Sequence, residues 1–114
     1  MRSYVPQAGD LIWLDFTAQA GREQAGRRPA VVLSPGIYNR SSRLAIVCPV
    51  TNQVKGYPFE LPLPDALPMT GVVLADHLRS LDWQVRRAEK AGRVSRQVMA
   101  EILERVAPLL GLAT

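Results

Sequence analysis

The chain has 114 residues, a length that predicts one domain spanning residues 1–114 with one hydrophobic core. Because 47% of the residues are hydrophobic and 21% are charged, the composition excludes an intrinsically disordered or supercharged chain. The only cysteine is Cys48 and the only histidine is His77, which excludes a disulfide framework, a zinc ribbon and any Cys/His metal cluster. No apolar run reaches the roughly 20 residues of a membrane span, and the first residues lack the apolar middle of a secretion signal. We therefore expect a soluble, cytoplasmic protein.

The charge balance points to a polyanionic partner. Fourteen basic residues against ten acidic ones give a net charge of +4, and all of the basic residues except Lys55 and Lys90 are arginines. Arginine binds phosphate through a planar fork of two hydrogen bonds, whereas lysine offers a point charge. The basic residues gather in two segments, Arg22, Arg27 and Arg28 in one and Arg79, Arg86, Arg87, Lys90, Arg93 and Arg96 in the other. A solvated basic surface is the alternative, but the pattern favours nucleic acid.

The first half of the chain predicts three strands, because runs of branched and aromatic residues are bounded by turn residues. These runs are residues 11–16, 30–34 and 44–50. Between the first two lies a polar, Gly-rich segment, residues 17–29, which predicts a long loop, and loops of this length are usually functional. Residues 35–42 begin with Pro-Gly and predict a turn followed by irregular chain.

The second half predicts two or three more strands and a terminal helix. The expected strands are residues 57–61, a longer one from 71 continuing to 83, and a short one near 88–94. Ser95 is the expected N-cap of the helix. Its apolar stripe is Val98, Ile102, Val106 and Leu109, with Pro108 expected to disrupt or kink the last turn and Gly111 to end it. Five or six short strands and one amphipathic helix favour a small, strongly bent β-barrel with the helix packed against it.

The familiar hydrolytic motifs are missing from the sequence, which has no P-loop, no GxSxG and no HExxH. Cys48 lies within an apolar strand pattern, which predicts a buried structural thiol rather than a nucleophile. His77 is expected in a strand, where a surface or hydrogen-bonded histidine is favoured over a general base.

Two polar residues at strand ends form a candidate site. Arg28 precedes the second predicted strand and Thr51 follows the third, so both can bind one phosphate if these strand ends are adjacent. The alternatives are a surface salt bridge from Arg28 to Glu23 and a turn role for Thr51 with a hydrogen bond to the backbone. Composition and pattern alone favour these alternatives.

Six stretches of sequence change that balance. In order, they are residues 4–6 (YVP), 9–13 (GDLIW), 23–26 (EQAG), 28–35 (RPAVVLSP), 55–60 (KGYPFE) and 74–76 (LAD). With these stretches the chain resembles the MazF/PemK family of toxin endoribonucleases, from residue 4 to the C-terminal helix. One stretch alone is weak evidence, but all six in order are specific.

The resemblance implies a mainly β fold, a small SH3-like barrel of the CcdB/PemK type with five to seven strands and a C-terminal α-helix. It also implies a homodimeric, growth-arresting toxin that cuts single-stranded RNA at short sequences with no metal or other cofactor, leaving 2′,3′-cyclic phosphate and 5′-hydroxyl ends. Its partner is expected to be a small, acidic MazE-like antitoxin, and opposite charges favour that pairing. The loop of residues 17–27 corresponds to one that orders around RNA or is displaced by the antitoxin.

The resemblance also assigns residues. The family's catalytic arginine falls on Arg28, its catalytic threonine on Thr51, and a loop glutamate that affects activity on Glu23. Arginine stays protonated, with a pKa of about 12.5 or higher, and is a poor general base, so Glu23 is the better base and the division of acid and base work stays open. His77 departs from the family, which has glutamine there, and Asn52 replaces a common threonine.

The residues expected to bind RNA are polar or basic: Gln24, Arg27, Lys55, His77, Arg79 and Arg86. Trp83, Tyr57 and Phe59 are candidates for stacking on bases, with burial in the core an equal alternative, and Trp13 is assigned to the core. A CcdB-like toxin that binds gyrase without enzymatic activity is the main alternative function. Arg28 and Thr51 favour the nuclease, and residues 111–114 lack the terminal tryptophan of gyrase poisons. An inactive module that binds RNA or antitoxin is the third possibility.

Overall fold

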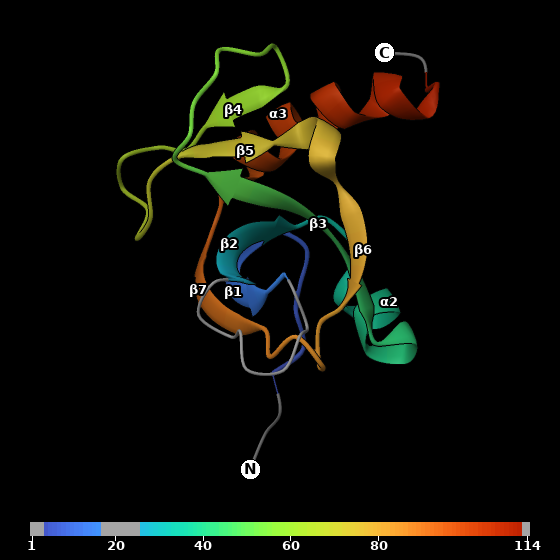
Figure 1. Cartoon of the computed structure of the whole chain (residues 1–114). Coiled ribbons are helices and arrows are strands. Elements are labelled where there is room, and N and C mark those ends of the chain that lie inside the picture. Colours follow the sequence, from blue (N-terminus) through green and yellow to red (C-terminus); the bar gives the residue numbers. More distant parts are fainter. Residues whose placement is uncertain (1–3, 17–25, 113–114) are drawn as a thin grey trace.

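The structure is a computed structural model that describes residues 4–16 and 26–112. Seven strands, two α-helices and two 3₁₀ helices lie in these residues (Figure 1). In chain order they are β1 (Asp10–Asp15), β2 (Arg27–Val32), α2 (Gly36–Ser42), β3 (Leu44–Thr51), β4 (Glu60–Pro62), β5 (Val72–Leu74), η1 (Ala75–His77), β6 (Arg79–Asp82), β7 (Glu89–Arg93), α3 (Arg96–Val106) and η2 (Ala107–Leu110).

The strands form an antiparallel sheet in the order β4-β5-β3-β2-β1-β7, with β6 paired to β3 beside this path. β3 is the central strand, because its first half pairs with β6 and its second half with β5. The predicted mainly β fold with a C-terminal helix is confirmed. The sheet curls strongly (Figure 1). However, β4 and β7, the strands at the two ends of the path, are not paired with each other among the described residues. A closed barrel is therefore not confirmed.

Three element predictions need correction. The predicted strand from 71 to 83 is split by η1, where the N–H of Ala75 donates to the carbonyl of Phe59 and the chain moves from one half of β3 to the other. His77 consequently lies on a 3₁₀ turn and not in a strand. The predicted loop 17–29 ends earlier, because residues 27–29 pair with β1 as the start of β2. The predicted strand 57–61 begins only at Glu60, whose N–H closes a turn on the carbonyl of Tyr57.

Helix α2 is a further correction, because irregular chain was predicted there. Its buried residue Asn39 donates from its side-chain amide to the carbonyls of Pro6 and Ser34 and accepts from the Ser34 hydroxyl. The carbonyl of Asn39 accepts the indole N–H of Trp83 at 2.9 Å. These contacts come from distant parts of the chain, so local sequence gives little sign of them.

The core consists of two apolar clusters separated by the curled sheet. One lies between the sheet and α3 and includes Val98, Ile102 and Val106 of the helix stripe. The other lies inside the curl and contains Trp83, which is 9% exposed, so the core alternative for this residue is confirmed. Trp13 was predicted in the core, and that is wrong, because it is 38% exposed.

The C-terminal helix is as predicted up to its last turn. The Ser95 hydroxyl caps it by accepting from the N–H of Val98 at 3.1 Å. Pro108 lies in η2, which ends at Gly111 in the left-handed conformation. Neither this helix nor any other in the described residues has the length and apolar character needed to cross a membrane.

Candidate active site

Two neighbouring cavities meet at the end of β3. The first has a volume of about 490 Å³ and is lined by Trp13, Arg28, Pro29, Val50, Thr51, Asn52, Gln53, Pro68, Met69 and Thr70. The second has a volume of about 340 Å³ and is lined by Thr51, Gln53, Lys55, Tyr57, Glu60, Leu74 and His77. Thr51 and Gln53 line both, so the two cavities share a wall.

Arg28 and Thr51 come together because β2 and β3 are antiparallel. Ala30 pairs with Pro49, and extending this register by two residues brings Arg28 opposite Thr51. The predicted adjacency of the two strand ends is thus confirmed. Arg28 is exposed in the first cavity, and its guanidinium has no hydrogen bond or ion pair with residues 4–16 and 26–112. No described residue therefore prevents the Arg28 guanidinium from binding an anion in the cavity.

The Thr51 hydroxyl has a defined orientation. Its oxygen accepts the N–H of Gln53 at 3.1 Å, as the turn alternative predicted, which leaves the hydroxyl proton for a second partner in the cavity. Gly71 makes this placement sterically feasible: it has φ of +126°, and a Cβ there would lie 2.5 Å from the carbonyl oxygen of Thr51. Only glycine combines that backbone conformation with that approach.

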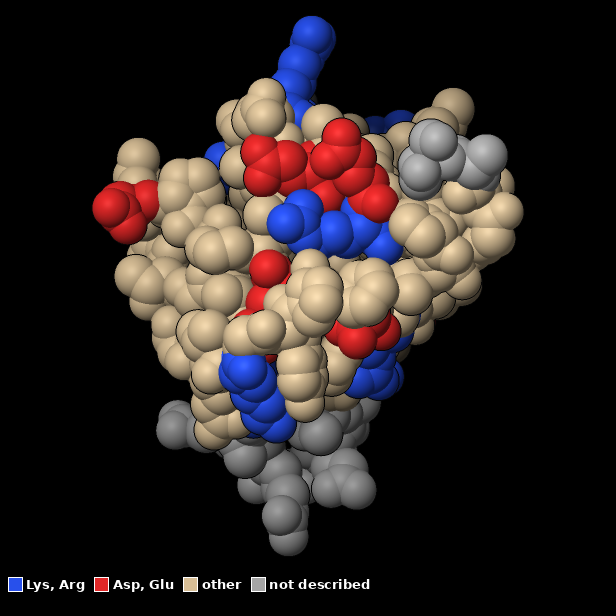
Figure 2. All heavy atoms as spheres, turned by 90° about the horizontal axis from the view of Figure 1, so that it is seen from above, with Lys and Arg blue, Asp and Glu red and all other residues tan. Residues whose placement is uncertain are grey.

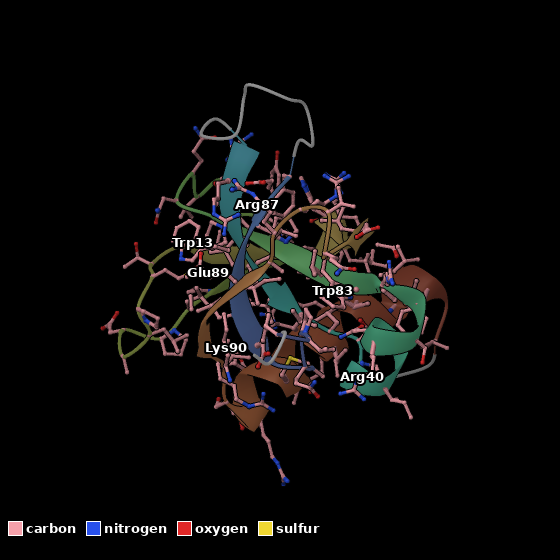
Figure 3. The ribbon with its side chains drawn as sticks, turned by 90° about the horizontal axis from the view of Figure 1, so that it is seen from below. Trp13, Arg40, Trp83, Arg87, Glu89 and Lys90 are labelled. Atoms are coloured by element: carbon pink, nitrogen blue, oxygen red, sulfur yellow. The ribbon has the colours of Figure 1, made fainter. Side chains whose placement is uncertain are left out.

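Trp13 is a residue that the sequence interpretation assigned to the wrong environment. It pairs with Pro29 on one side and Glu89 on the other, and its side chain lines the first cavity. Figure 3 shows Trp13 and Glu89 close together, with Arg87 nearby. An exposed indole that lines the same cavity as the Arg28 guanidinium is a suitable surface for a nucleobase.

Glu60 is the buried carboxylate of the second cavity, and the sequence interpretation missed it. Its oxygens accept the backbone N–H of Gly56 at 2.8 Å and of Lys55 at 3.0 and 3.2 Å. Burial raises the pKa of the Glu60 carboxyl, but the hydrogen bonds from the backbone of residues 55–57 outweigh it and hold the pKa below its ordinary value. The sequence signal was an acidic residue on a strand immediately after a glycine turn.

Lys55 and His77, both predicted to bind RNA, line this second cavity together with the exposed Tyr57. His77 Nε2 lies 3.8 Å from the Asp76 carboxylate. Phe59 points the other way and packs against the core.

Arg27 lies outside both cavities. Its guanidinium forms ion pairs with Asp15 at 3.1 Å and Glu89 at 3.0 Å and donates to the carbonyl of Arg87. Arg87 also pairs with Asp15, at 2.9 Å. Hydrogen bonds from Arg87, and then from Arg27, hold the pKa of the Asp15 carboxyl below its ordinary value despite burial. We call Asp15, Arg27, Arg87 and Glu89 the Asp15 ion cluster.

Of the remaining residues predicted to bind RNA, two lie near the Asp15 ion cluster and one lies outside the described residues. The Arg79 guanidinium lies 5.5 Å from the centre of the Phe16 ring, and Arg86 donates to the carbonyls of Asp15 and Phe16. Glu23 and Gln24 lie outside the described residues.

The end of the molecule formed by β4, α3 and η2 carries charges of both signs (Figure 2). Figure 2 shows the end formed by β4, α3 and η2, where acidic and basic side chains lie next to one another among uncharged residues. Gln97 and Glu101 of α3 form a hydrogen bond with each other there. A polyanion gains little from such a mixed surface.

Other chemistries find little support in the described residues. Cys48 is buried, and burial, followed by the nearby Asp76 carboxylate, raises the pKa of its thiol to about 12. Such a thiol is not a nucleophile at neutral pH, and the predicted structural role of Cys48 fits this environment. Within residues 4–16 and 26–112, no three His, Cys, Asp or Glu side chains gather to hold a metal ion.

Comparison with known proteins identifies a family for this chain. Residues 7–110 match the family described as PemK-like, MazF-like toxin of type II toxin-antitoxin system. The chain is 46% identical over 108 residues to the endoribonuclease toxin MazF of Escherichia coli K12, covering 95% of this chain and 96% of that protein.

Solved structures of the same family have a similar fold. MazF from Deinococcus radiodurans superposes with a TM-score of 0.88 at 56% identity, covering 96% of this chain and all of the other. A MazE–MazF structure from the same organism gives a TM-score of 0.87 at 50% identity, covering 97% of this chain and all of the matched chain. The resemblance inferred from the sequence is confirmed, and the chain belongs to the PemK-like, MazF-like toxins of type II toxin–antitoxin systems.

Proposed function

We propose that this family member is an endoribonuclease toxin that cuts single-stranded RNA at specific short sequences and thereby arrests growth. The observation that carries the proposal is the meeting of Arg28 and Thr51 at one cavity beside the exposed Trp13. This is a cation, a hydroxyl and an aromatic surface at one place, which suits a phosphodiester flanked by a base. Relatives at 46% and 36% identity are named endoribonucleases, in agreement with this chemistry.

In the proposed mechanism the scissile phosphate lies in the first cavity. The 2′-oxygen forms a bond to phosphorus, the bond from phosphorus to the 5′-oxygen breaks, and the products are a 2′,3′-cyclic phosphate and a 5′-hydroxyl. Arg28 stabilises the charge that develops on the equatorial oxygens, and the Thr51 hydroxyl donates to one of them. These residues require no metal ion for that role.

One proton must leave the 2′-hydroxyl and one must reach the 5′-oxygen. Because an arginine keeps its proton, we assign the base to Glu23. The Glu23→Gln variant is then expected to lower kcat while leaving RNA affinity nearly unchanged, measured by single-turnover cleavage and by binding of uncleaved RNA. A kcat equal to that of the unaltered protein would remove Glu23 from the chemistry.

RNA binding extends from the cavities in two directions. Lys55 and His77 contact the RNA at the second cavity, while Arg27, Arg79 and Arg86 contact its backbone on the side of β1. Gln24, which lies outside the described residues, is a further proposed contact. Since the Asp15 ion cluster already engages Arg27, we expect its contribution to RNA binding to be smaller than that of Arg28.

The proposed partners are a second copy of the chain and an acidic, MazE-like antitoxin. MazE–MazF structures are known for a relative of similar fold, and an acidic peptide complements a chain of net charge +4. We propose the cytoplasm as the site of action, since both RNA and antitoxin are found there.

The test is incubation of the antitoxin-free protein with a long single-stranded RNA in EDTA, followed by mapping of the new ends. We expect discrete cuts with 5′-hydroxyl ends that Arg28→Ala abolishes. Intact RNA in the presence of folded protein would overturn the nuclease and favour the gyrase-binding or inactive alternative.

A further inference from the structure

One wall of the second cavity is a turn whose backbone N–H groups are bound by a buried carboxylate. This wall is the turn of residues 55–59, which carries Lys55 and the exposed Tyr57. Glu60 begins β4 and pairs with Leu74 of β5, so its backbone belongs to the sheet. The carboxylate reaches back from this rigid base and accepts two successive backbone N–H groups, those of Lys55 and Gly56.

The same turn has two further attachments. The N–H of Glu60 donates to the carbonyl of Tyr57 at 3.1 Å, and Arg105 of α3 donates from Nε to the carbonyl of Pro58 at 3.2 Å. Gly56 has φ of +84°, the conformation that lets consecutive N–H groups converge on one anion. The turn is therefore fixed to the sheet on one side and to the C-terminal helix on the other.

We propose that Glu60 is a positioning residue for substrate selection: it holds the turn of residues 55–59 as the wall against which the nucleobase next to the cut phosphate is read. The proposal rests on the proposed nuclease function. The two cavities share Thr51, so a nucleotide whose phosphate meets Arg28 and Thr51 has a neighbour that enters the second cavity. There the Tyr57 ring is available for stacking, and His77 and Lys55 for hydrogen bonds to base edges.

A buried carboxylate bound by backbone N–H groups cannot be replaced by its amide without loss. In Glu60→Gln one acceptor oxygen becomes an NH₂ donor, which faces the N–H of Lys55 in either orientation of the amide, although size and shape are kept. Charge-assisted hydrogen bonds are about twice as strong as neutral ones. The turn is then expected to lose its fixed position, while Arg28 and Thr51 keep theirs because β2 and β3 place them.

The experiment compares the unaltered protein with Glu60→Gln and with Glu104→Gln, a matched change of an exposed glutamate on α3. The Glu104 side chain has no hydrogen bond or ion pair among the described residues. For each protein we measure kcat and KM on a single-stranded RNA that contains the cut sequence, map cuts on a long RNA, and follow amide hydrogen exchange at Lys55 and Gly56.

For Glu60→Gln we expect KM to rise about tenfold or more, because that is the effect of losing one charge-assisted hydrogen bond. We expect kcat to change little. The cut sequence should broaden at one base next to the phosphate, and exchange at the two amides should accelerate. Glu104→Gln should match the unaltered protein in all three readouts. If Glu60→Gln does not fold, Arg105→Ala loosens the same turn from the other side and should broaden the cut sequence likewise.

The proposal is overturned if Glu60→Gln cuts the same sequence with the same KM, whether or not its amides exchange faster. Unchanged exchange would also overturn it, because the carboxylate would then not hold the turn. Failure of the unaltered protein to cut any RNA is a different result, since it overturns the nuclease function itself and with it this proposal.

Discussion

Arg27 and Arg28 are neighbours on one strand and have opposite situations. Arg27 is enclosed in the Asp15 ion cluster, with a carboxylate on two sides and a carbonyl on a third. Arg28 faces the first cavity and has no partner in the part of the chain that the structure describes. Successive side chains of a strand point to opposite faces, so a pair of adjacent arginines supplies one structural cation and one that is free for a ligand.

The largest effect that follows from this difference is on cleavage. Arg28→Ala should lower the cleavage rate by about a thousandfold, as expected for removal of the cation that stabilises a developing phosphorane. Its melting temperature should stay close to that of the unaltered protein, because no described contact is lost. Gel-based cleavage and thermal unfolding measure the two. A variant that loses stability but keeps most of its activity would reverse the assignment.

Arg27→Ala should show the opposite pattern. Removing this guanidinium leaves the buried Asp15 carboxylate with fewer donors, so the free energy of unfolding should fall by about 1–2 kcal/mol. Cleavage per folded molecule should fall much less than in Arg28→Ala. Chemical denaturation and single-turnover cleavage provide the comparison, and equal losses of activity in the two variants would contradict it.

The Trp13→Ala variant tests whether a base stacks beside Arg28 in the first cavity. If a base stacks on this indole, its loss should weaken RNA binding by about tenfold, the lower end of the range for stacking. Because Trp13 is 38% exposed, the fold should tolerate the change. Binding of RNA in the Arg28→Ala background, where no cutting is expected, isolates this effect. Unchanged affinity would exclude stacking at this position.

The smallest effect concerns acid stability on the Arg27 side. The pKa of Asp15 in the folded protein lies below its ordinary value of 3.8, so the folded state binds this proton less readily than the unfolded chain. The stabilisation is complete above pH 3.8 and is lost as the pH falls through the lower, folded value. Thermal unfolding should therefore depend less steeply on pH in that range for Asp15→Asn than for the unaltered protein. Identical slopes would show that the ion cluster adds nothing to acid stability.

The sequence predicted the strands well wherever branched residues form long buried runs, as in β3, and the helix wherever apolar spacing was regular. It failed at α2, because that helix depends on Asn39 contacting Pro6 and Trp83, which are remote in the chain. The predicted strand 71–83 was wrong at η1, because its apolar pattern continues through the point where pairing moves from one half of β3 to the other. Both failures arise from pairing and packing that no local pattern encodes.

The candidate site was predicted in its central pair and missed at its margins. Arg28 and Thr51 stand at strand ends, which is a property of the sequence, and the resemblance gave them weight. Trp13 lies between buried residues on both sides, so its pattern is that of a core strand, but its side chain lines the first cavity and belongs to neither core cluster. Glu60 was missed because its role lies in bonds to the backbone of the turn before it.

Thr51 belongs to both cavities, and this has a consequence for how such a toxin can diverge. Under the proposed mechanism, a change at the shared wall alters the cutting of the phosphate and the choice of base at once. A lineage that acquires a new target sequence while keeping its rate must therefore change the outer wall. Lys55, Tyr57 and His77 are there. The shared residues Thr51 and Gln53 thus restrict change at the centre of the site and leave its periphery open to variation.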